Sequence, residues 1–268
     1  MQLSDQHFQA VTQLFQQISG IKLTAAKRSL VQGRLQKLAL EHGLDSIDEY
    51  VDGVMSRRQP GEIRLIVDRL TTNETYFYRE PEHFEFLAEW LRQHRPASAF
   101  RVWSAASSSG EEAHTIAMVL AEQLSGIPWE IVGTDLSSAM IEAASQGLYP
   151  MERVQKLPAA WLKRYCLKGS GEYSGQVLVD RSLRSRIRFQ QANLTQPLPD
   201  LGQFDIIFLR NVLIYFDDAG KRDIVQRVLT RLRRGGLLFT GHAESLSNLQ
   251  LPIRMVKPAI YAPTDSHH

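Results

Sequence analysis

The sequence is poor in cysteine and has no long apolar run. Cys166 is the single cysteine among 268 residues. One cysteine excludes an intrachain disulfide and a cysteine-rich zinc site, and it fits a reducing compartment. No stretch approaches the roughly 18 apolar residues of a membrane span, and the first residues lack the basic and then apolar pattern of a signal peptide. We therefore expect a cytoplasmic protein without membrane insertion.

An excess of charge of one sign is also lacking. The chain has 31 basic and 29 acidic residues, which leaves a formal net charge of +2. Overall charge therefore gives no reason to expect a nucleic acid partner, and only local clusters could favour one.

The first seventy residues predict helices only. Phe8, Val11 and Phe15 recur at helical spacing. We expect a small helical domain over residues 1–70, in which Thr24 caps a second helix that ends near residue 42.

The second predicted helix carries bases and no acid between residues 22 and 37. Lys27, Arg34 and Lys37 fall within about 80° of its circumference, at roughly 100° per residue. An arc of one sign can attract an acidic partner. A solvated helix face is the commoner explanation, and the absence of interleaved aromatic residues argues against nucleic acid.

Residues 71–96 are expected to form a linker and a connecting helix that Pro81 opens. The stretch Leu70–Pro81 is too polar for a core element and too aromatic for a flexible tether. It could be a lid over a ligand or a packed joint between domains, and composition slightly favours the joint.

From residue 97 onward, strands and helices alternate, which predicts an α/β domain with a parallel sheet. We expect strands at 100–106, 130–135, 187–194, 204–209, 237–241 and 259–262. Residues 150–186 interrupt the alternation and predict a small β insertion. A turn is expected at Gly235–Gly236, before the strand that follows.

The most informative stretch is 204–217. Its apolar beginning predicts a strand buried on both faces of a sheet. Arg210 and Asn211 follow, and then Tyr215. Ligands bind outside the carboxyl ends of such strands, so these side chains could line a site. They could equally well cap the next helix.

The first strand and the second strand indicate the kind of ligand. Gly110 is the only glycine of the turn after the first strand, so the three-glycine dinucleotide fingerprint is absent. Glu111 and Glu112 would repel a pyrophosphate and favour a ligand with a positive group. Asp135 ends the second strand, where an acid commonly holds ribose hydroxyls.

His242 and Glu244 could be taken for metal ligands, but two residues are too few. We expect no metal site.

Four motifs together resemble the chemotaxis receptor methyltransferase family, CheR: Thr72–Glu80, Trp103–Glu112, Arg210–Phe216 and Gly241–Ser245. The resemblance covers nearly the whole chain. It implies a Rossmann-like class I methyltransferase sheet after the helical domain. The sequence departs from the common family pattern at Ala106–Ser109 and at Ala113–His114, which bears on fine cofactor geometry and not on the class.

The resemblance implies S-adenosylmethionine as methyl donor, with S-adenosylhomocysteine as product. It implies that Asn73, Thr75 and Arg79 close over the cofactor. Glu112 would face its methionine end, whose ammonium is a positive group, and Asp135 would hold the ribose.

The same resemblance places Asn193 and Leu194 around the adenine. Arg210 and Asn211 would complete the pocket.

The implied acceptors are glutamate side chains of methyl-accepting chemotaxis receptors. A carboxylate is ionised at neutral pH, so no general base is expected. Arg79 and Tyr215 are the candidates for the catalytic residues near the acceptor. Arg79 could instead hold the cofactor carboxylate, and Tyr215 could simply pack after the strand.

Two regions could bind the receptor. Lys27, Arg34 and Lys37 could dock its glutamate-rich helices. Gly169 and Gly171 match the Gly-x-Gly turn through which some family members bind a peptide at the receptor's C-terminus. A monomer is expected.

Three other functions stay open at this point. The chain could methylate another acceptor, it could bind S-adenosylmethionine or S-adenosylhomocysteine as a regulatory module without turnover, or it could be a nicotinamide oxidoreductase. The missing glycines and the two glutamates argue against the last.

Overall fold

The computed structural model describes residues 1–264 and divides the chain into two compact units. One comprises Met1–Thr72 with Tyr215–Gly220, and the other comprises Asn73–Ile214 with the chain from Lys221 onward. Each is described by itself below, as the N-terminal unit and the sheet unit. None of the helices in the described chain is long and apolar enough to cross a membrane.

The N-terminal unit is helical, as predicted. Its helices are α1 (Asp5–Ser19), η1 (Ala25–Lys27), α2 (Arg28–Glu41), α3 (Ile47–Arg57) and α4 (Pro60–Leu70). The Ser4 hydroxyl accepts a hydrogen bond from the His7 amide at 3.3 Å and caps α1. Gly20 ends α1 with a left-handed φ of 75°. Phe8, Val11 and Phe15 are buried, which confirms the predicted apolar face of α1.

One predicted cap is wrong. The Thr24 side chain makes no capping hydrogen bond, and the chain first turns through η1. The α-helix itself begins only at Arg28. Residue type alone therefore placed the start of this helix about one turn too early.

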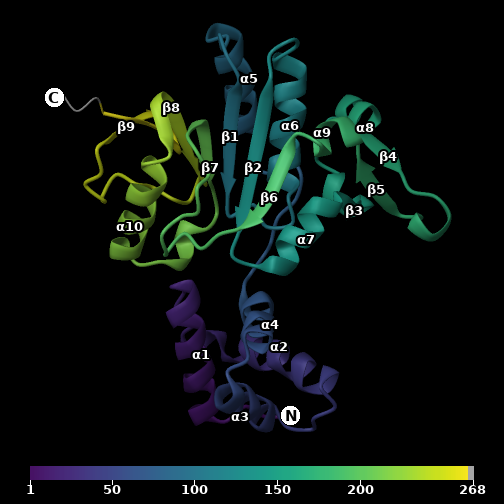
Figure 1. The fold of residues 1–268 in the computed structure, drawn as a ribbon, viewed down its shortest axis with the longest axis vertical. Helices are drawn as coiled ribbons and strands as arrows, with labels where there is room; N and C mark the ends of the chain where they lie inside the picture. The colour runs from purple at the N-terminus through teal and green to yellow at the C-terminus, as the bar shows by residue number, and fades with distance from the viewer. Residues whose placement is uncertain (265–268) are drawn as a thin grey trace. The chain divides into compact units, whose positions relative to one another are not determined.

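The sheet unit contains a seven-stranded sheet in the order β6-β2-β1-β7-β8-β10-β9 (Figure 1). Its strands are β1 (Phe100–Ala105), β2 (Trp129–Asp135), β6 (Ile187–Gln191), β7 (Phe204–Leu209), β8 (Leu232–Thr240), β9 (Ile253–Lys257) and β10 (Ile260–Pro263). Its main helices are α5 (Pro81–Gln93), α6 (Glu111–Gln123), α7 (Ser138–Gln146) and α10 (Asp218–Leu229), the last from Lys221 onward.

The parallel strands end level with one another. Ala105 of β1 pairs with Thr134 of β2 on one side and with Leu209 of β7 on the other. Leu209 in turn pairs with Thr240 at the end of β8. The chain runs outward from β1 through β2 to β6 and then resumes at β7 on the other side of β1. This reversal is a topological switch point, where open α/β sheets bind ligands.

The predicted burial of β7 on both faces is confirmed. Phe208 stacks on Phe84 of α5 at 5.9 Å and on Phe239 of β8 at 4.5 Å between ring centroids. Ile207 and Leu209 are also fully buried, and alternation along a strand turns their side chains to the opposite face. The strand that leads to Arg210 is therefore held from both sides.

The β insertion contains more strands and short helices than predicted. It forms a three-stranded antiparallel sheet in the order β3-β5-β4, with β3 (Leu148–Pro150), β4 (Cys166–Lys168) and β5 (Gln176–Val179). Between and after these strands lie η2 (Met151–Val154), α8 (Ala159–Tyr165), η3 (Gly171–Tyr173) and α9 (Arg181–Arg184). Strands of three or four residues are too short to show a periodic pattern, which explains why the sequence indicated only one.

Two predictions near the C-terminus are corrected. Gly235–Gly236 lies inside β8 and not in a turn before it, and the pairing register with β7 shifts between Phe204 and Ile206. Gly235 has a φ of 78°, which is typical of a bulge residue. The sequence also missed β9, an edge strand with mostly exposed residues.

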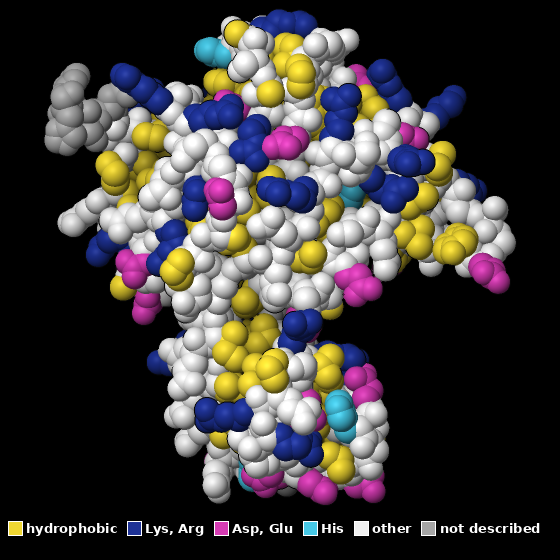
Figure 2. Space-filling view, in the orientation of Figure 1, with side chains coloured by type: hydrophobic (Ala, Val, Ile, Leu, Met, Phe, Trp, Pro, Cys, Tyr) yellow, Lys and Arg dark blue, Asp and Glu magenta, His cyan; other side chains and the backbone are white. Residues whose placement is uncertain are grey.

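Surface charge on the sheet unit is mixed. Figure 2 shows Lys and Arg side chains spread over the visible face of this unit among polar and apolar ones, without a continuous band. Nucleic-acid-binding domains commonly present a basic stripe, and this face presents none.

Truncation of Phe208 tests the core that carries the site. We expect Phe208→Ala to lower the free energy of unfolding of the sheet unit by about 3–5 kcal/mol, the usual cost of a large cavity. All four tryptophans (Trp90, Trp103, Trp129 and Trp161) lie in this unit, so their fluorescence in urea reports it alone. Met255, 50% exposed, is the control, and Met255→Ala should change stability by less than about 0.5 kcal/mol. Equal effects of the two substitutions would contradict this description of the core.

Candidate active site at the carboxyl ends of the strands

Arg210 is the central residue of the site. It follows β7 directly, and its side chain is 1% exposed. Its guanidinium donates to the Glu112 carboxylate at 3.0 Å and to the Glu80 carboxylate at 3.0 Å. It also donates to the carbonyl of Arg79. A buried charge must be paired. The partners of Arg210 are carboxylates at the start of α6 and directly before α5.

The two carboxyl groups respond differently to this environment. Burial raises the pKa of Glu112, and Arg210 and the Ser104 hydroxyl only partly oppose that effect. Burial also acts to raise the pKa of Glu80, but the charge of Arg210 and hydrogen bonds from Arg210 and Asn211 outweigh it and lower this pKa. The site therefore stabilises the ionised form of Glu80, and a further positive group would stabilise the ionised form of Glu112.

Asn211 occupies a strained backbone position that a second network supports. Its φ is 57°, and its amide donates to Glu244 at 2.7 Å. The Gly241 amide donates to the same carboxylate oxygen at 2.7 Å. The Asn211 side chain donates to Glu80 at 3.2 Å. A Cβ at position 241 would lie 2.6 Å from the Asn211 side-chain nitrogen Nδ2, so the network requires a glycine there.

These contacts decide one open alternative. Two helices follow, η4 (Leu213–Tyr215) and α10. In the described chain, the Arg210 and Asn211 side chains bind the carboxylates of Glu80 and Glu112 and the Arg79 carbonyl, and cap neither helix.

The linker segment, defined as residues 73–80, is an ordered part of the sheet unit. Phe77 is fully buried in its core. The Tyr78 amide donates to the Thr115 hydroxyl at 3.2 Å, and the Phe77 amide donates to the Arg153 carbonyl at 3.1 Å. Arg79 donates back to the Glu74 carbonyl at 2.8 Å. The segment therefore leads from Asn73 and Thr75 to Glu80 along a fixed path beside Arg210.

Asp135 binds the loop after β1. Its carboxylate accepts hydrogen bonds from the Ser108 amide at 2.8 Å and from the Ser137 amide at 2.9 Å. Ala106, Ser108 and Gly110 of that loop have positive φ values of 60°, 50° and 93°. Strained backbone of this kind is concentrated at functional sites.

Asn193 and Leu194 follow β6, which ends earlier than predicted, at Gln191. The Asn193 side-chain oxygen accepts from the Thr195 amide at 3.0 Å. The Leu194 carbonyl accepts from Arg227 at 2.6 Å. Both residues therefore lie in a fixed turn beyond the carboxyl end of a strand, and their place around the adenine stays a prediction.

Several predicted residues belong to other places. Tyr215 ends the short helix η4 (Leu213–Tyr215) and is grouped with the N-terminal unit. Lys27 and Lys37 are exposed on that unit. Arg34 donates to the carbonyls of Leu70 at 2.8 Å and Thr71 at 3.1 Å, so it holds the end of α4 as well as belonging to the basic arc.

Gly169 and Gly171 of the insertion are glycines for different structural reasons. A Cβ at Gly169 would lie 2.0 Å from the Tyr173 carbonyl oxygen, which excludes any side chain there. Gly171 has a φ of 59° and open space around it. Leu167 of β4 and Tyr173, each 55% exposed, lie near this turn in sequence.

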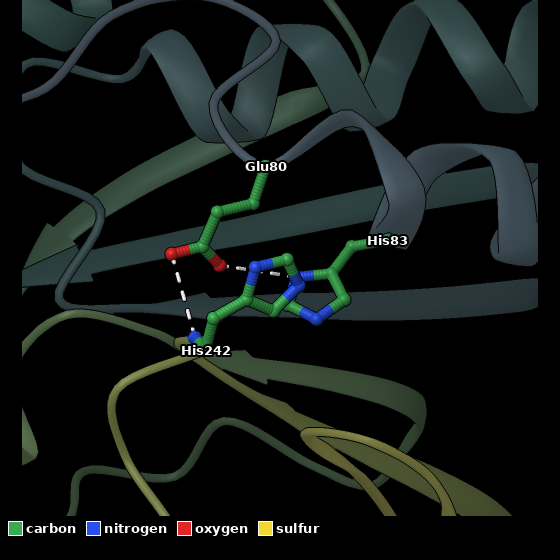
Figure 3. A group of neighbouring side chains, drawn as sticks. All are labelled: Glu80, His83 and His242. Carbon is green, nitrogen blue, oxygen red and sulfur yellow. Dashed lines mark hydrogen bonds and ion pairs between the residues drawn. The ribbon is translucent and has the colours of Figure 1, made fainter.

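Glu80, His83 and His242 form a further cluster that the sequence did not indicate (Figure 3). One ligand atom from each lies within 4.8 Å of the others. Burial lowers the pKa of His83 to about 3. Both Glu80 oxygens already accept from Arg210 and Asn211, and the Arg210 cation would oppose a metal ion. The His242 main-chain amide donates to Glu80 at 3.4 Å, and the His83 and His242 rings pack on each other at 4.7 Å between centroids. The absence of a metal stays a prediction.

Comparison with known proteins gives the family. The family model described as "CheR methyltransferase, SAM binding domain" matches residues 73–262. The model described as "CheR methyltransferase, all-alpha domain" matches residues 6–71. The chain belongs to the CheR methyltransferase family. The resemblance stated from the motifs is therefore confirmed.

Named relatives agree over almost the full length. The chemotaxis protein methyltransferase of Salmonella typhimurium is 38% identical over 97% of this chain and 91% of its own. Chemotaxis protein methyltransferase 2 of Pseudomonas aeruginosa is 38% identical over 96% of this chain and 92% of its own. The relative from Borreliella burgdorferi is 32% identical over 90% and 88% of the two chains.

The cofactor of this CheR chain is S-adenosylmethionine, and the site fits it chemically. The Ser107 hydroxyl and the Arg210 Nε atom are buried without a hydrogen-bond partner, as expected of polar atoms that face a ligand. Gly110 lets the loop after β1 pack closely on α7, since a Cβ there would lie 2.8 Å from the Ala144 Cβ. Glu112 would hold the ammonium of the methionine end. The residue assignments themselves stay predictions.

The sequence did not indicate the structural roles of Glu80 and Gly241, and it considered Glu244 only as a metal ligand. Each lies in a motif that carried the resemblance. The adjacency of Glu80 to Arg79 was the available signal. Its pairing with Arg210, 130 residues away in sequence, could not be read from spacing.

The raised pKa of Glu112 predicts proton release on cofactor binding. Burial raises this pKa in the free protein, and a bound ammonium would lower it again. Affinity for S-adenosylhomocysteine should therefore rise with pH through the range above the ordinary value of 4.5 and then level off. Calorimetry at several pH values and in two buffers measures both effects.

Glu112→Gln should abolish this pH dependence and weaken binding by about 10- to 100-fold, the usual value of hydrogen bonds to charged groups. The matched control is Glu122→Gln on the same helix, whose carboxylate binds Arg164. An unchanged pH profile in Glu112→Gln would refute the assignment.

Proposed function

We propose that this chain transfers the methyl group of S-adenosylmethionine to glutamate side chains of chemotaxis receptors in the cytoplasm. The observation that carries the proposal is the full-length similarity, across both units, to proteins named as chemotaxis protein methyltransferases. The site around Arg210 supports it, because the two carboxylates of Glu80 and Glu112 beside one guanidinium favour a cationic ligand.

The proposed reaction is an in-line displacement. The bound cofactor supplies a methyl group on a positively charged sulfur. A carboxylate oxygen of the acceptor forms the new bond to the methyl carbon while the carbon–sulfur bond breaks and its electron pair stays on sulfur. The carboxylate is already ionised at neutral pH, so the chain need supply no general base.

The residues act by orientation and by exclusion of water. An anion and a cation become two neutral products, so water stabilises the reactants more than the transition state. A site that replaces water and aligns the reacting atoms therefore accelerates the reaction. Glu112 would position the donor, and Arg79 and Tyr215 are proposed to lie near the acceptor.

The receptor is proposed to bind at two further places. The exposed Lys27 and Lys37, with Arg34 in the same arc, would attract the glutamate-rich helices. The insertion would bind a receptor's C-terminal peptide at the Gly169–Gly171 turn. β4 is an edge strand of its sheet, and edge strands accept extended peptides through main-chain hydrogen bonds. We propose that the enzyme acts as a monomer.

Release of methanol tests the reaction. The protein is mixed with methyl-labelled S-adenosylmethionine and membranes that contain chemoreceptors, and the product is treated with base. Volatile labelled methanol is expected, because base hydrolyses a carboxyl methyl ester. Cofactor binding with no base-labile label on any receptor tested would refute the acceptor and favour a regulatory module without turnover.

Charge reversal tests docking. Lys27→Glu with Lys37→Glu should lower kcat/KM for receptor at least tenfold at low salt and much less at high salt, because exposed charges are screened. Affinity for S-adenosylhomocysteine should not change. Arg34 is left intact because it binds the end of α4.

The control for this experiment reverses two other exposed bases of the same unit. Lys22→Glu with Arg58→Glu changes net charge equally, and both residues are exposed. If the control lowers kcat/KM as much as the test variant, net charge and not the arc governs the encounter.

A further inference from the structure

The insertion contacts the linker segment through ring packing, with Tyr149 at 4.9 Å from Phe77 and Trp161 at 5.6 Å from Tyr78, and through polar contacts of residues 151–156. The Phe77 amide donates to the Arg153 carbonyl at 3.1 Å. The Arg153 guanidinium returns a hydrogen bond to the Thr75 carbonyl. Arg153 thus binds the linker on both sides of Tyr76, with its main chain and with its side chain.

Lys156 makes a second contact with the same part of the linker. Its ammonium lies 4.4 Å from the centroid of the Tyr76 ring and 3.3 Å from the Tyr76 hydroxyl. The Arg79 guanidinium lies 5.9 Å from the same ring. A base of the insertion and Arg79 of the linker therefore both lie close to the Tyr76 ring, and cation–π attraction acts on the ring from both.

Arg153 also reaches the start of α6. Its guanidinium lies 3.5 Å from the Glu111 carboxylate, whose side chain is 1% exposed. The other Glu111 oxygen accepts from the Ser109 hydroxyl at 2.7 Å. Burial raises the pKa of Glu111, and the charge of Arg153 opposes this effect. Glu111 is the neighbour of Glu112, so Arg153 joins the linker to the turn that presents Glu112.

Arg153 supplies a large share of what fixes the linker. In the described chain, the backbone of residues 74–79 is bound to the rest of the sheet unit by Arg153, by the Thr115 hydroxyl and by Arg210. Only Arg153 anchors it before Phe77. Without the Arg153 side chain, the part of the segment that carries Asn73 and Thr75 would lose the hydrogen bond at the Thr75 carbonyl, whereas the bond from the Phe77 amide to the Arg153 main chain would remain.

We propose that Arg153 is a positioning residue for cofactor binding, and that Lys156 assists it by holding Tyr76 against Arg79. The inference deepens the proposed function and rests on its assignment of Asn73, Thr75 and Arg79 to the cofactor. The insertion then serves the cofactor site as well as any peptide, because its first turn sets the path of the linker.

Substitution of Arg153 tests the proposal with S-adenosylhomocysteine as probe. Arg153→Gln should raise the dissociation constant about 10- to 100-fold, as expected for loss of hydrogen bonds from a charged group. Arg153→Lys keeps the charge but loses the planar fork, so its dissociation constant should lie between those of the parent and of Arg153→Gln. Arg164→Gln is the matched control, since Arg164 is also a base of the insertion that binds α6, through Glu122 at 2.8 Å; it should stay within twofold of the parent.

Two readouts separate positioning from a general loss of structure. Amide hydrogen exchange of Phe77 and Tyr78 should become faster in Arg153→Gln, while exchange in β1 and β7 stays as in the parent. In the methyl-transfer assay, KM for S-adenosylmethionine should rise while kcat at saturating cofactor is largely retained, because the defect is in positioning before the reaction.

Every outcome is decisive. Unchanged affinity and unchanged exchange in Arg153→Gln would overturn the proposal. If that variant does not fold, Lys156→Gln takes its place, since Lys156 is exposed; a two- to fivefold weaker affinity supports the proposal and an unchanged one overturns it. The binding assay contains no receptor, so failure of the receptor assignment cannot imitate failure of this one.

Discussion

The buried guanidinium of Arg210, held between the carboxylates of Glu112 and Glu80, is the interaction on which the site depends. It joins three parts of the chain: the end of β7, the start of α6 and the residue before α5. Removing one partner of a buried ion pair is far more costly than the pair is stabilising, because it leaves an uncompensated charge. The arrangement is therefore best understood as a geometric constraint. It fixes where the linker meets the sheet, and stability is a lesser part of its role.

A second layer of backbone contacts makes that constraint rigid. Glu244 accepts from the amides of Asn211 and Gly241 and thereby ties the ends of β7 and β8 together. Asn211 can then hold a left-handed conformation that its residue type tolerates better than most. Its side chain is directed to Glu80, which also binds Arg210. Glu80 thus connects both layers, and the close approach at Gly241 is what permits the connection.

Features with a local cause could be predicted, and those with a distant cause could not. The apolar run of β7, the cap at Ser4 and the helix start at Pro81 each follow from neighbouring residues. The bulge at Gly235 depends on β7, which lies beside it in the sheet, because a Cβ at Gly236 would lie 2.6 Å from the Asp205 carbonyl. The short strands of the insertion and the edge strand β9 gave no periodic signal. The ion pair of Arg210 with Glu112 spans 98 residues, so its two halves were predicted as site residues but not as partners.

The charge of the site explains why this sheet binds a sulfonium cofactor and not a dinucleotide. Glu80 and Glu112 face a single guanidinium, so with both ionised the cluster carries one negative charge more than Arg210 neutralises. A pyrophosphate would add to that excess, whereas an ammonium beside Glu112 removes it. The helix start that favours anions in dinucleotide folds is occupied here by the carboxyl groups of the protein itself. In the sequence, Glu111 and Glu112 argued against a phosphate ligand. In the structure, Glu112 binds Arg210 and Glu111 pairs with Arg153, and these contacts help to hold the loop and the linker in place.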